Sequence, residues 1–268
     1  MAHDRRPILT TFADKVDVRD YVADKVGRKY LTNVYAVLDK VDLDVFNPKI
    51  LPRNFVIKAN HGSGGVIIVN DREDESKNLP NEGEIKSIGW TRLSIHPDKL
   101  DWNLVKTILT KWMNMNYYYF PGCFPEWAYK NIQPRILIEE LLSGTSGVPD
   151  DYRFFCFNGR CEYIQVDTPV YTGSGVLRDI FDRDWNKLDV TLKYPNSNIA
   201  RSRPRSLEEM IMIAELLSSE IDHVRVDLYD LDGRIVFGEL TNYHAAGTQK
   251  FNPELFDKLF GESWHPEY

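Results

Sequence analysis

Cysteine is scarce in this sequence. The 268 residues include three, Cys123, Cys156 and Cys161. Three is an odd number, and no two of these residues have the C-x-x-C spacing of zinc or redox sites. The sequence therefore disfavours a disulfide framework and a structural metal, and it favours a reducing compartment.

Long apolar runs are missing as well. No run approaches the roughly 20 residues that cross a bilayer. The N-terminal stretch also lacks the apolar core of roughly 7 to 15 residues that a signal peptide needs. We therefore expect a soluble, cytoplasmic protein that does not insert into membranes.

Positive charge is not in excess. The sequence has 33 Lys and Arg residues and 40 Asp and Glu residues, which gives a net charge of −7. This balance disfavours sequence-independent binding to nucleic acid or anionic lipid, so any phosphate ligand needs a local basic site. The 43% hydrophobic and 27% charged residues are typical of a globular protein, and the length admits two lobes or one large domain.

Amphipathic spacing of apolar residues predicts helices over residues 14–26, 98–115 and 206–219. Ser206 opens the last of these, and Glu209 stands three positions later. This pattern predicts a capping box at the start of that helix.

Between the helices the sequence predicts β-hairpins. NFVIKA and VIIV, within residues 54–70, are short β-rich runs joined by a glycine loop. RFFCF and RCEYIQV are joined by Asn158-Gly159, a dipeptide that favours a type I′ turn. RILIEELL, residues 135–142, begins as a buried strand, and the small and polar residues after it predict a lobe boundary or hinge near 143–150.

The glycine loop is the first candidate site. A strand that ends near Lys58 leads into five residues rich in backbone N–H groups: His61, Gly62, Ser63, Gly64 and Gly65. These groups suit phosphate oxygens, although a glycine-rich hairpin turn explains the glycines as well. The loop is neither a P-loop nor a G-x-G-x-x-G motif, because no G-K-[ST] ends it and a strand follows.

The second candidate site is a hairpin over residues 222–241. We predict a three-residue turn at 231–233, which pairs position 227 with 237. Four polar side chains then share one face: Arg225, Asp227, Glu239 and Thr241. The opposite face is then apolar: Val224, Val226, Leu228 and Val236.

The register of this hairpin decides its chemistry. A two-residue Asp-Gly turn would put Asp227 and Glu239 on opposite faces. On one face, the two carboxylates could flank magnesium bound to a polyphosphate. The alternative is a solvated face with an Arg–Glu pair.

Charged residues near the hinge form the third candidate. Glu139 and Glu140 end the apolar strand and could accept hydrogen bonds from adenine or ribose, or cap the strand with solvated charge. Asp151 and Arg153 follow, and Arg153 suits a phosphate or a surface ion pair. The aromatic run NYYYFPGCFPEW, residues 116–127, we interpret as core or lobe interface rather than a base-stacking surface.

In their order along the chain, these features resemble the ATP-grasp superfamily. More narrowly, the sequence resembles the TupA-like ATP-grasp family, linked to teichuronopeptide synthesis, over residues 12–261. The segments that carry the resemblance are FADKVDVRDYV, LPRNFVIKANHGSGG, YKNIQPRILIEELL, PDDYRFFCFNG, FDRDW, RVDLYDLDGRIVFGELT and Phe251-Asn252-Pro253.

The resemblance implies an α+β ATP-grasp fold, in which two lobes with antiparallel sheets clasp ATP under a glycine-rich flap loop. It implies three parts: a short N-terminal helical lobe (1–53), a small lobe with the glycine loop (54–142) and a large lobe with the magnesium site (143–268). At this length we expect the acceptor to bind mainly at the lobe interface.

The resemblance also implies residue roles. ATP would contact Lys58, His61, Gly62, Ser63, Gly64, Gly65, Glu139, Glu140, Leu141, Leu142, Asp151 and Arg153. Magnesium would be held by Asp227 and Glu239, with Thr241 or Asn242 as a further ligand, because Thr stands where the superfamily often has Asn. The catalytic residues would be Arg225, Arg153 and Lys58. An additional lysine of the superfamily would be Lys15 or Lys130.

The implied activity is ATP-dependent ligation of a carboxylate to an amine through an acyl phosphate, with ATP and Mg²⁺ as cofactors. The family suggests an amino acid or other amine, and a uronic acid or similar small-molecule or glycan-linked carboxylate. The setting would be cell-surface polysaccharide or natural-product biosynthesis. Two other classes stay open: a phosphotransferase acting on a glycan or small hydroxyl acceptor, and a non-catalytic nucleotide-binding protein.

Overall fold

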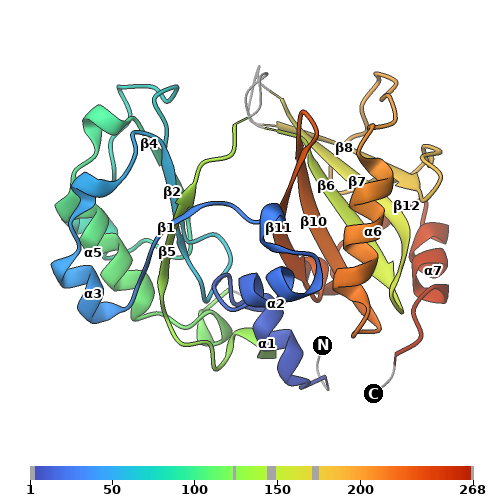
Figure 1. Cartoon of the computed structure of the whole chain (residues 1–268), viewed down its shortest axis with the longest axis horizontal. Helices are drawn as coiled ribbons and strands as arrows, with labels where there is room; N and C mark the ends of the chain where they lie inside the picture. The colour runs from blue at the N-terminus through green and yellow to red at the C-terminus, as the bar shows by residue number, and fades with distance from the viewer. Residues whose placement is uncertain (1–3, 123–124, 144–148, 171–174, 267–268) are drawn as a thin grey trace.

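Two five-stranded sheets form the framework of the protein (Figure 1). The structure, a computed structural model, describes residues 4–122, 125–143, 149–170 and 175–266. The strand orders are β1-β5-β2-β3-β4 and β11-β10-β6-β7-β8. Within the described residues, no helix is long and apolar enough to cross a membrane.

The first sheet is antiparallel apart from the parallel pair β3 and β4. Its strands are β1 (Val34–Leu38), β2 (Phe55–Ala59), β3 (Val66–Val69), β4 (Arg92–Ile95) and β5 (Ile136–Glu140). Its helices are α3 (Lys40–Val45), α4 (Glu82–Ile85) and α5 (Trp102–Met113). The Val- and Ile-rich strands pack one face against α5, where Ile57, Ile138 and Trp112 share a core. Helices α3 and α5 lie on the side away from the second sheet (Figure 1).

The second sheet is antiparallel throughout. Its strands are β6 (Asp151–Phe157), β7 (Arg160–Val170), β8 (Gly175–Asp182), β10 (His223–Leu231) and β11 (Arg234–Thr241). One face packs against α1 (Pro7–Ala13), α2 (Val18–Lys25) and α6 (Leu207–Ser218). The other face is covered at one end only, by β9 (Thr191–Leu192), β12 (Phe251–Asn252) and α7 (Leu255–Glu262).

Short 3₁₀ turns complete the structure. They are η1 (Arg28–Tyr30), η2 (Pro48–Ile50), η3 (Pro97–Lys99), η4 (Tyr117–Tyr119), η5 (Trp127–Tyr129) and η6 (His244–Gly247).

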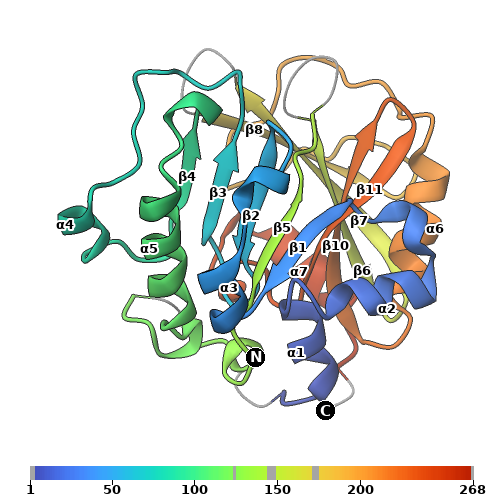
Figure 2. The ribbon, with the colours of Figure 1, turned by 60° about the vertical axis from the view of Figure 1, so that its left-hand side comes forward.

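The N-terminal segment contributes to both halves of the molecule. Strand β1 lies at one edge of the first sheet, and α1 and α2 lie beyond it on the side of the second sheet (Figure 2). The division into parts at residues 53 and 142 stays a prediction. The hinge expected near 143–150 lies mostly outside the described residues.

Most local predictions are confirmed. The helices expected over 14–26, 98–115 and 206–219 form as α2, α5 and α6. The strands on either side of the glycine loop form as β2 and β3. Asn158 and Gly159 have φ of 48° and 77° and connect the paired residues at the ends of β6 and β7, as a type I′ turn requires.

The predicted capping box of α6 is wrong. The Ser206 hydroxyl makes no bond to the helix backbone and instead donates to the Asp230 carboxylate. Glu209 accepts a hydrogen bond from the Tyr30 hydroxyl at 2.6 Å. Both side chains therefore connect α6 to neighbouring elements rather than closing its first turn.

The cysteines do not add to the framework within the described residues. Cys156 and Cys161 are buried free thiols on adjacent strands, and Cys123 lies outside the described residues.

Candidate functional site

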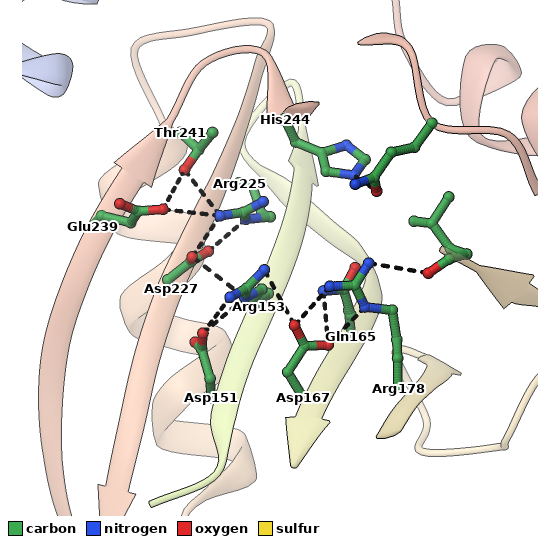
Figure 3. Close-up of polar contacts among 12 residues, drawn as sticks. Asp151, Arg153, Gln165, Asp167, Arg178, Arg225, Asp227, Glu239, Thr241 and His244 are labelled. Atoms are coloured by element: carbon green, nitrogen blue, oxygen red, sulfur yellow. Dashed lines mark hydrogen bonds and ion pairs between the residues drawn. The ribbon is translucent and has the colours of Figure 1, made fainter. Parts of the chain in front are cut away.

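Charged side chains alternate in sign across the open face of the second sheet (Figure 3). The row consists of Glu239 on β11, Arg225 and Asp227 on β10, Arg153 on β6, Asp167 on β7 and Arg178 on β8. The period of two along a strand puts these residues on one face and their apolar neighbours in the core on the other. The sheet therefore presents a built polar surface.

Arg225 is the centre of the row. Its Nε and Nη2 donate to the two oxygens of Asp227, both at 2.6 Å. The same Nη2 donates to Glu239 Oε1 and to Thr241 Oγ1, each at 3.0 Å. Three oxygens from three residues thus converge on one cationic nitrogen.

The predicted register of this hairpin is wrong in detail. The turn has two residues, Asp232 and Gly233, because Leu231 pairs with Arg234. A bulge at Gly238 then shifts the pairing by one position, so that Asp227 lies directly opposite Glu239. The two-residue turn alone would put Asp227 and Glu239 on opposite faces. The bulge shifts the pairing back by one position, so the two side chains share one face, as the three-residue turn was expected to give.

The two-residue turn also changes the apolar face. Val224, Val226 and Leu228 lie in the core as predicted, but on β11 their partners are Ile235, Phe237 and Leu240 rather than Val236. Val236 alternates with Ile235 and Phe237, and it therefore faces the other way.

Arg153 and Arg178 extend the row. Arg153 donates to Asp151 at 2.6 and 2.8 Å and lies 3.3 Å from Asp167 and 3.6 Å from Asp227. Arg178 forms a bidentate pair with Asp167 at 2.7 Å. Sequence reasoning missed Asp167 and Arg178; the position of Asp167 two residues after Gln165 in β7 was the available signal, and Arg178, between Val176 and Ile180, had none of this kind.

The two hairpin carboxyls differ in electrostatics. Partial desolvation would raise the pKa of Glu239, but Arg225, Lys15 and Arg153 outweigh it and lower that pKa to about 2. Burial raises the pKa of Asp227 to about 7, against Arg225 and Arg153, which favour its charged form. Glu239, whose side chain is 50% exposed, is therefore the firmly charged member of the pair.

Asp227 and Glu239 fit a magnesium ion that takes its remaining ligands from phosphate and water. Mg²⁺ prefers oxygen ligands and commonly uses one or two carboxylates with substrate phosphates. The Thr241 hydroxyl lies on the same face, whereas the Asn242 amide donates to the Leu9 carbonyl at 3.0 Å, beside α1. Among the described residues, no three His, Cys, Asp or Glu side chains could hold a metal by themselves.

The glycine loop lies under an indole ring. A Cβ on Gly62 would lie 2.6 Å from Trp90, and one on Gly65 would lie 2.9 Å from it. Gly64 has φ of +94°, which a glycine adopts without strain. His61 is buried, and both of its ring nitrogens face protein oxygens at 3.0 Å, from Asn60 and Trp112.

Lys15 lies near both the glycine loop and the charged row, and Lys58 lies near Lys15. Lys58 Nζ is 2.5 Å from Glu139 Oε1. Lys15 donates to the Gly62 carbonyl at 2.6 Å, and its pKa is lowered by burial and raised in turn by the charge of Glu239. Lys130 lies elsewhere, with its ammonium 5.4 Å from the Tyr118 ring.

Glu139 and Glu140 are both held by protein side chains. Glu139 is buried and contacts Lys58, Thr32 and Arg19, the last at 3.1 Å. Glu140 accepts two hydrogen bonds from Arg234 at 2.7 and 2.9 Å. Because Arg234 belongs to β11, this pair joins the two sheets beside the half-buried Leu141 and Leu142.

The order of these elements agrees with one known family. A family model described as TupA-like ATPgrasp matches residues 1–265. The chain belongs to the TupA-like ATP-grasp family. Membership confirms the resemblance of the sequence and the ATP-grasp fold.

Solved structures that match the chain include ATP-grasp ligases. D-alanine–D-alanine ligase from Bacillus anthracis, complexed with ATP, is 15% identical with a TM-score of 0.46, over 96% of this chain and 67% of that one. The Helicobacter pylori enzyme is 15% identical with a TM-score of 0.40, over 87% and 54%. The ATP-grasp ligase PsnB, complexed with a minimal precursor, is 10% identical with a TM-score of 0.41, over 88% and 54%.

The chain thus spans about half the length of the Helicobacter pylori ligase and of PsnB. No curated protein sequence matches it.

Proposed function

We propose that the protein is an ATP-dependent carboxylate–amine ligase that forms an amide and releases ADP and phosphate. The observation that carries the proposal is the convergence of Asp227, Glu239 and Thr241 on the guanidinium of Arg225. Carboxylates for magnesium and a cation for a developing negative charge thereby occupy one face, and Lys15 links that face to the glycine loop.

ATP would bind between the two sheets. Lys58, Lys15 and the loop His61, Gly62, Ser63, Gly64 and Gly65 would surround its phosphates, and the loop backbone would supply N–H donors. The adenine would lie against the backbone of Glu139, Glu140, Leu141 and Leu142, because both glutamate side chains already have protein partners. Asp151 and Arg153 would lie toward the ribose and phosphates.

Asp227 and Glu239, with Thr241 rather than Asn242 beside them, would hold magnesium. When bound, the ion supplies positive charge that offsets the charge of the phosphates. Arg153 and Arg225 are held by carboxylates and therefore need little reorganisation to donate to phosphate and carboxylate oxygens during the reaction.

The reaction consists of two transfers. A substrate carboxylate oxygen attacks the γ-phosphorus of ATP, and the bond to ADP breaks, which gives an acyl phosphate. The neutral amine nitrogen then attacks the acyl carbon and gives up one proton to solvent, and inorganic phosphate leaves with its electron pair. Arg225 would donate to the oxyanion of this second step, and the glycine loop would keep water from the acyl phosphate.

The substrates we propose rest on the family. They are an amino acid or other amine, and a uronic acid or similar small-molecule or glycan-linked carboxylate, joined in cell-surface polysaccharide or natural-product biosynthesis. We place the reaction in the cytoplasm, where ATP is available.

A screen of paired carboxylates and amines tests the proposal. ADP release should require both members of one pair, and mass spectrometry should detect their amide together with free phosphate. A phosphorylated acceptor without free phosphate would identify a phosphotransferase instead. A folded Glu239→Gln variant should lose product formation; full function in that variant would indicate a non-catalytic nucleotide-binding protein.

A further inference from the structure

A buried carboxylate contacts the lysine of strand β2. Glu139 Oε1 is 2.5 Å from Lys58 Nζ. Glu139 Oε2 accepts hydrogen bonds from Arg19 Nη1 at 3.1 Å and from the Thr32 hydroxyl. The two oxygens of this carboxylate therefore contact two different cations, one from β2 and one from α2.

Arg19 is held in place by the segment that precedes β1. Its Nη1 also donates to Thr32 Oγ1 at 2.9 Å, and its Nη2 donates to the Thr32 carbonyl at 2.5 Å. Arg19 belongs to α2, which packs against the core of the second sheet. Glu139 and Lys58 are on neighbouring strands of the first sheet. The contact therefore joins the two halves of the molecule at a lysine that we propose binds ATP.

Glu139 carries a negative charge in this environment. Burial disfavours the charged carboxylate, but Lys58, Thr32 and Arg19 outweigh it and lower the pKa of Glu139 below its ordinary value. A buried carboxylate needs cations and hydrogen bonds of this kind to offset its desolvation. One carboxylate with two cations leaves an excess of one positive charge in the cluster.

Lys58 is the most exposed member of the cluster. Its side chain is 31% exposed, whereas the side chains of Arg19 and Glu139 are 16% and 5% exposed. Without Arg19, the charge of Glu139 would be offset by Lys58 alone, and the pair would have no net charge. A phosphate would then compete with Glu139 for the same ammonium group.

We propose that Arg19 is a positioning residue for ATP: it neutralises Glu139, so that the ammonium of Lys58 stays in a fixed place and keeps its charge for the phosphates. Arg19 acts through Glu139 and does not contact ATP itself. The inference rests on the proposed function and adds a residue that was not among the predicted site residues.

Nucleotide binding tests this role before any carboxylate or amine is known. Calorimetric titrations would use AMP-PNP, a non-hydrolysable analogue of ATP, together with Mg²⁺, and adenosine, which has no phosphate. Arg19→Gln should raise the Kd for AMP-PNP about 10-fold, as expected for the loss of one interaction between charged groups. The Kd for adenosine should not change, because adenosine brings no charge to Lys58.

A double variant separates charge balance from structure. Arg19→Gln combined with Glu139→Gln removes both opposite charges and leaves Lys58 with its full charge. Its Kd for AMP-PNP should return to near the wild-type value, whereas damage to the structure at Arg19 would not be repaired by a second substitution. Arg19→Lys keeps the charge and should recover part of the affinity.

Lys25→Gln is the matched control. Lys25 is also on α2, but it pairs at 2.7 Å with Glu220, whose side chain is exposed. The variant removes one positive charge from the same helix and should leave both Kd values unchanged.

The possible results separate the positioning role from the ligase proposal. A folded Arg19→Gln variant that binds AMP-PNP like the wild type would overturn the role of Arg19. A folded double variant whose Kd stays about 10-fold or more above the wild-type value would overturn it too, and this comparison does not need a folded Arg19→Gln variant. Both results leave the ligase proposal standing. A folded wild-type protein that does not bind AMP-PNP would overturn the ligase proposal, and the role of Arg19 with it.

Discussion

The packing of Trp90 over the glycine loop makes a quantitative prediction for Gly62→Ala. The added Cβ would lie 2.6, 2.8 and 2.8 Å from three carbons of the indole ring, whereas carbon atoms pack best at roughly 3.5–4.0 Å. Gly62 does not have a positive φ, so the backbone itself accepts alanine. The cost is therefore steric, and overpacking of this kind costs about 1–3 kcal/mol of unfolding free energy.

A double-mutant cycle isolates that contact. Urea denaturation of wild type, Gly62→Ala, Trp90→Leu and the double variant gives the coupling energy between the two positions. We expect the smaller side chain at position 90 to recover about 1–2 kcal/mol of the alanine penalty. Gly62→Ala alone should also raise the KM for ATP, because the indole must push the loop aside.

Gly64→Ala is the matched control. Its Cβ would come no closer than 3.4 Å to Trp90, and its φ of +94° is unfavourable for alanine. The penalty there arises in the backbone, so Trp90→Leu should not relieve it. A coupling between positions 62 and 90 of less than about 0.5 kcal/mol would refute the reasoning.

Three other predictions concern the charged row, pH and the contact between the sheets. Glu239→Gln should lower the kcat for ADP release by about 100-fold or more while circular dichroism shows a folded protein; activity near the wild-type value would exclude a role for this carboxylate. Burial lowers the pKa of His223 to about 4. With respect to this group, the folded state therefore has its full stability above the ordinary histidine pKa of about 6.5 and loses stability as the pH falls toward 4. The free energy of unfolding from urea denaturation should therefore drop over this range by up to about 1.4 kcal/mol per pH unit, and an equally steep drop in His223→Gln would contradict this. Arg234→Ala removes an exposed pair with Glu140 and should cost less than about 1 kcal/mol in the same assay; a larger loss would show that the pair holds the sheets together.

Local features of the fold could be predicted because their signals are local. The strands around Lys58 follow from β-rich runs, and the Asn158-Gly159 turn follows from two residues that accept positive φ. The sequence also showed that Asp227 and Glu239 belong to one hairpin. Their shared face was confirmed, although the reasoning used the wrong turn.

The bulge at Gly238 could not be predicted from hairpin rules alone. A Cβ at this position would lie 3.0 Å from Tyr229 and 3.1 Å from the carbonyl of Asp227. Only glycine allows the strands to approach this closely there, and that approach shifts the pairing. The glycine before Glu239 was the available signal, but its meaning depends on the partner strand.

Contacts between distant elements explain the other differences. Ser206 has the sequence of a helix cap, yet its hydroxyl donates to Asp230, 24 positions away. Arg178 and Asp167 meet because β7 and β8 are paired. Such partners depend on strand order and register, which no local pattern determines.

The central claim is that the charged row activates a carboxylate by phosphoryl transfer. The most direct measurement uses the carboxylate identified by the screen, labelled with ¹⁸O in its carboxyl group, together with ATP and the amine. Mass spectrometry of the released inorganic phosphate should show one ¹⁸O atom per amide formed, because an acyl phosphate passes its bridging oxygen to phosphate. Phosphate without ¹⁸O, at equal amide yield, would contradict the account.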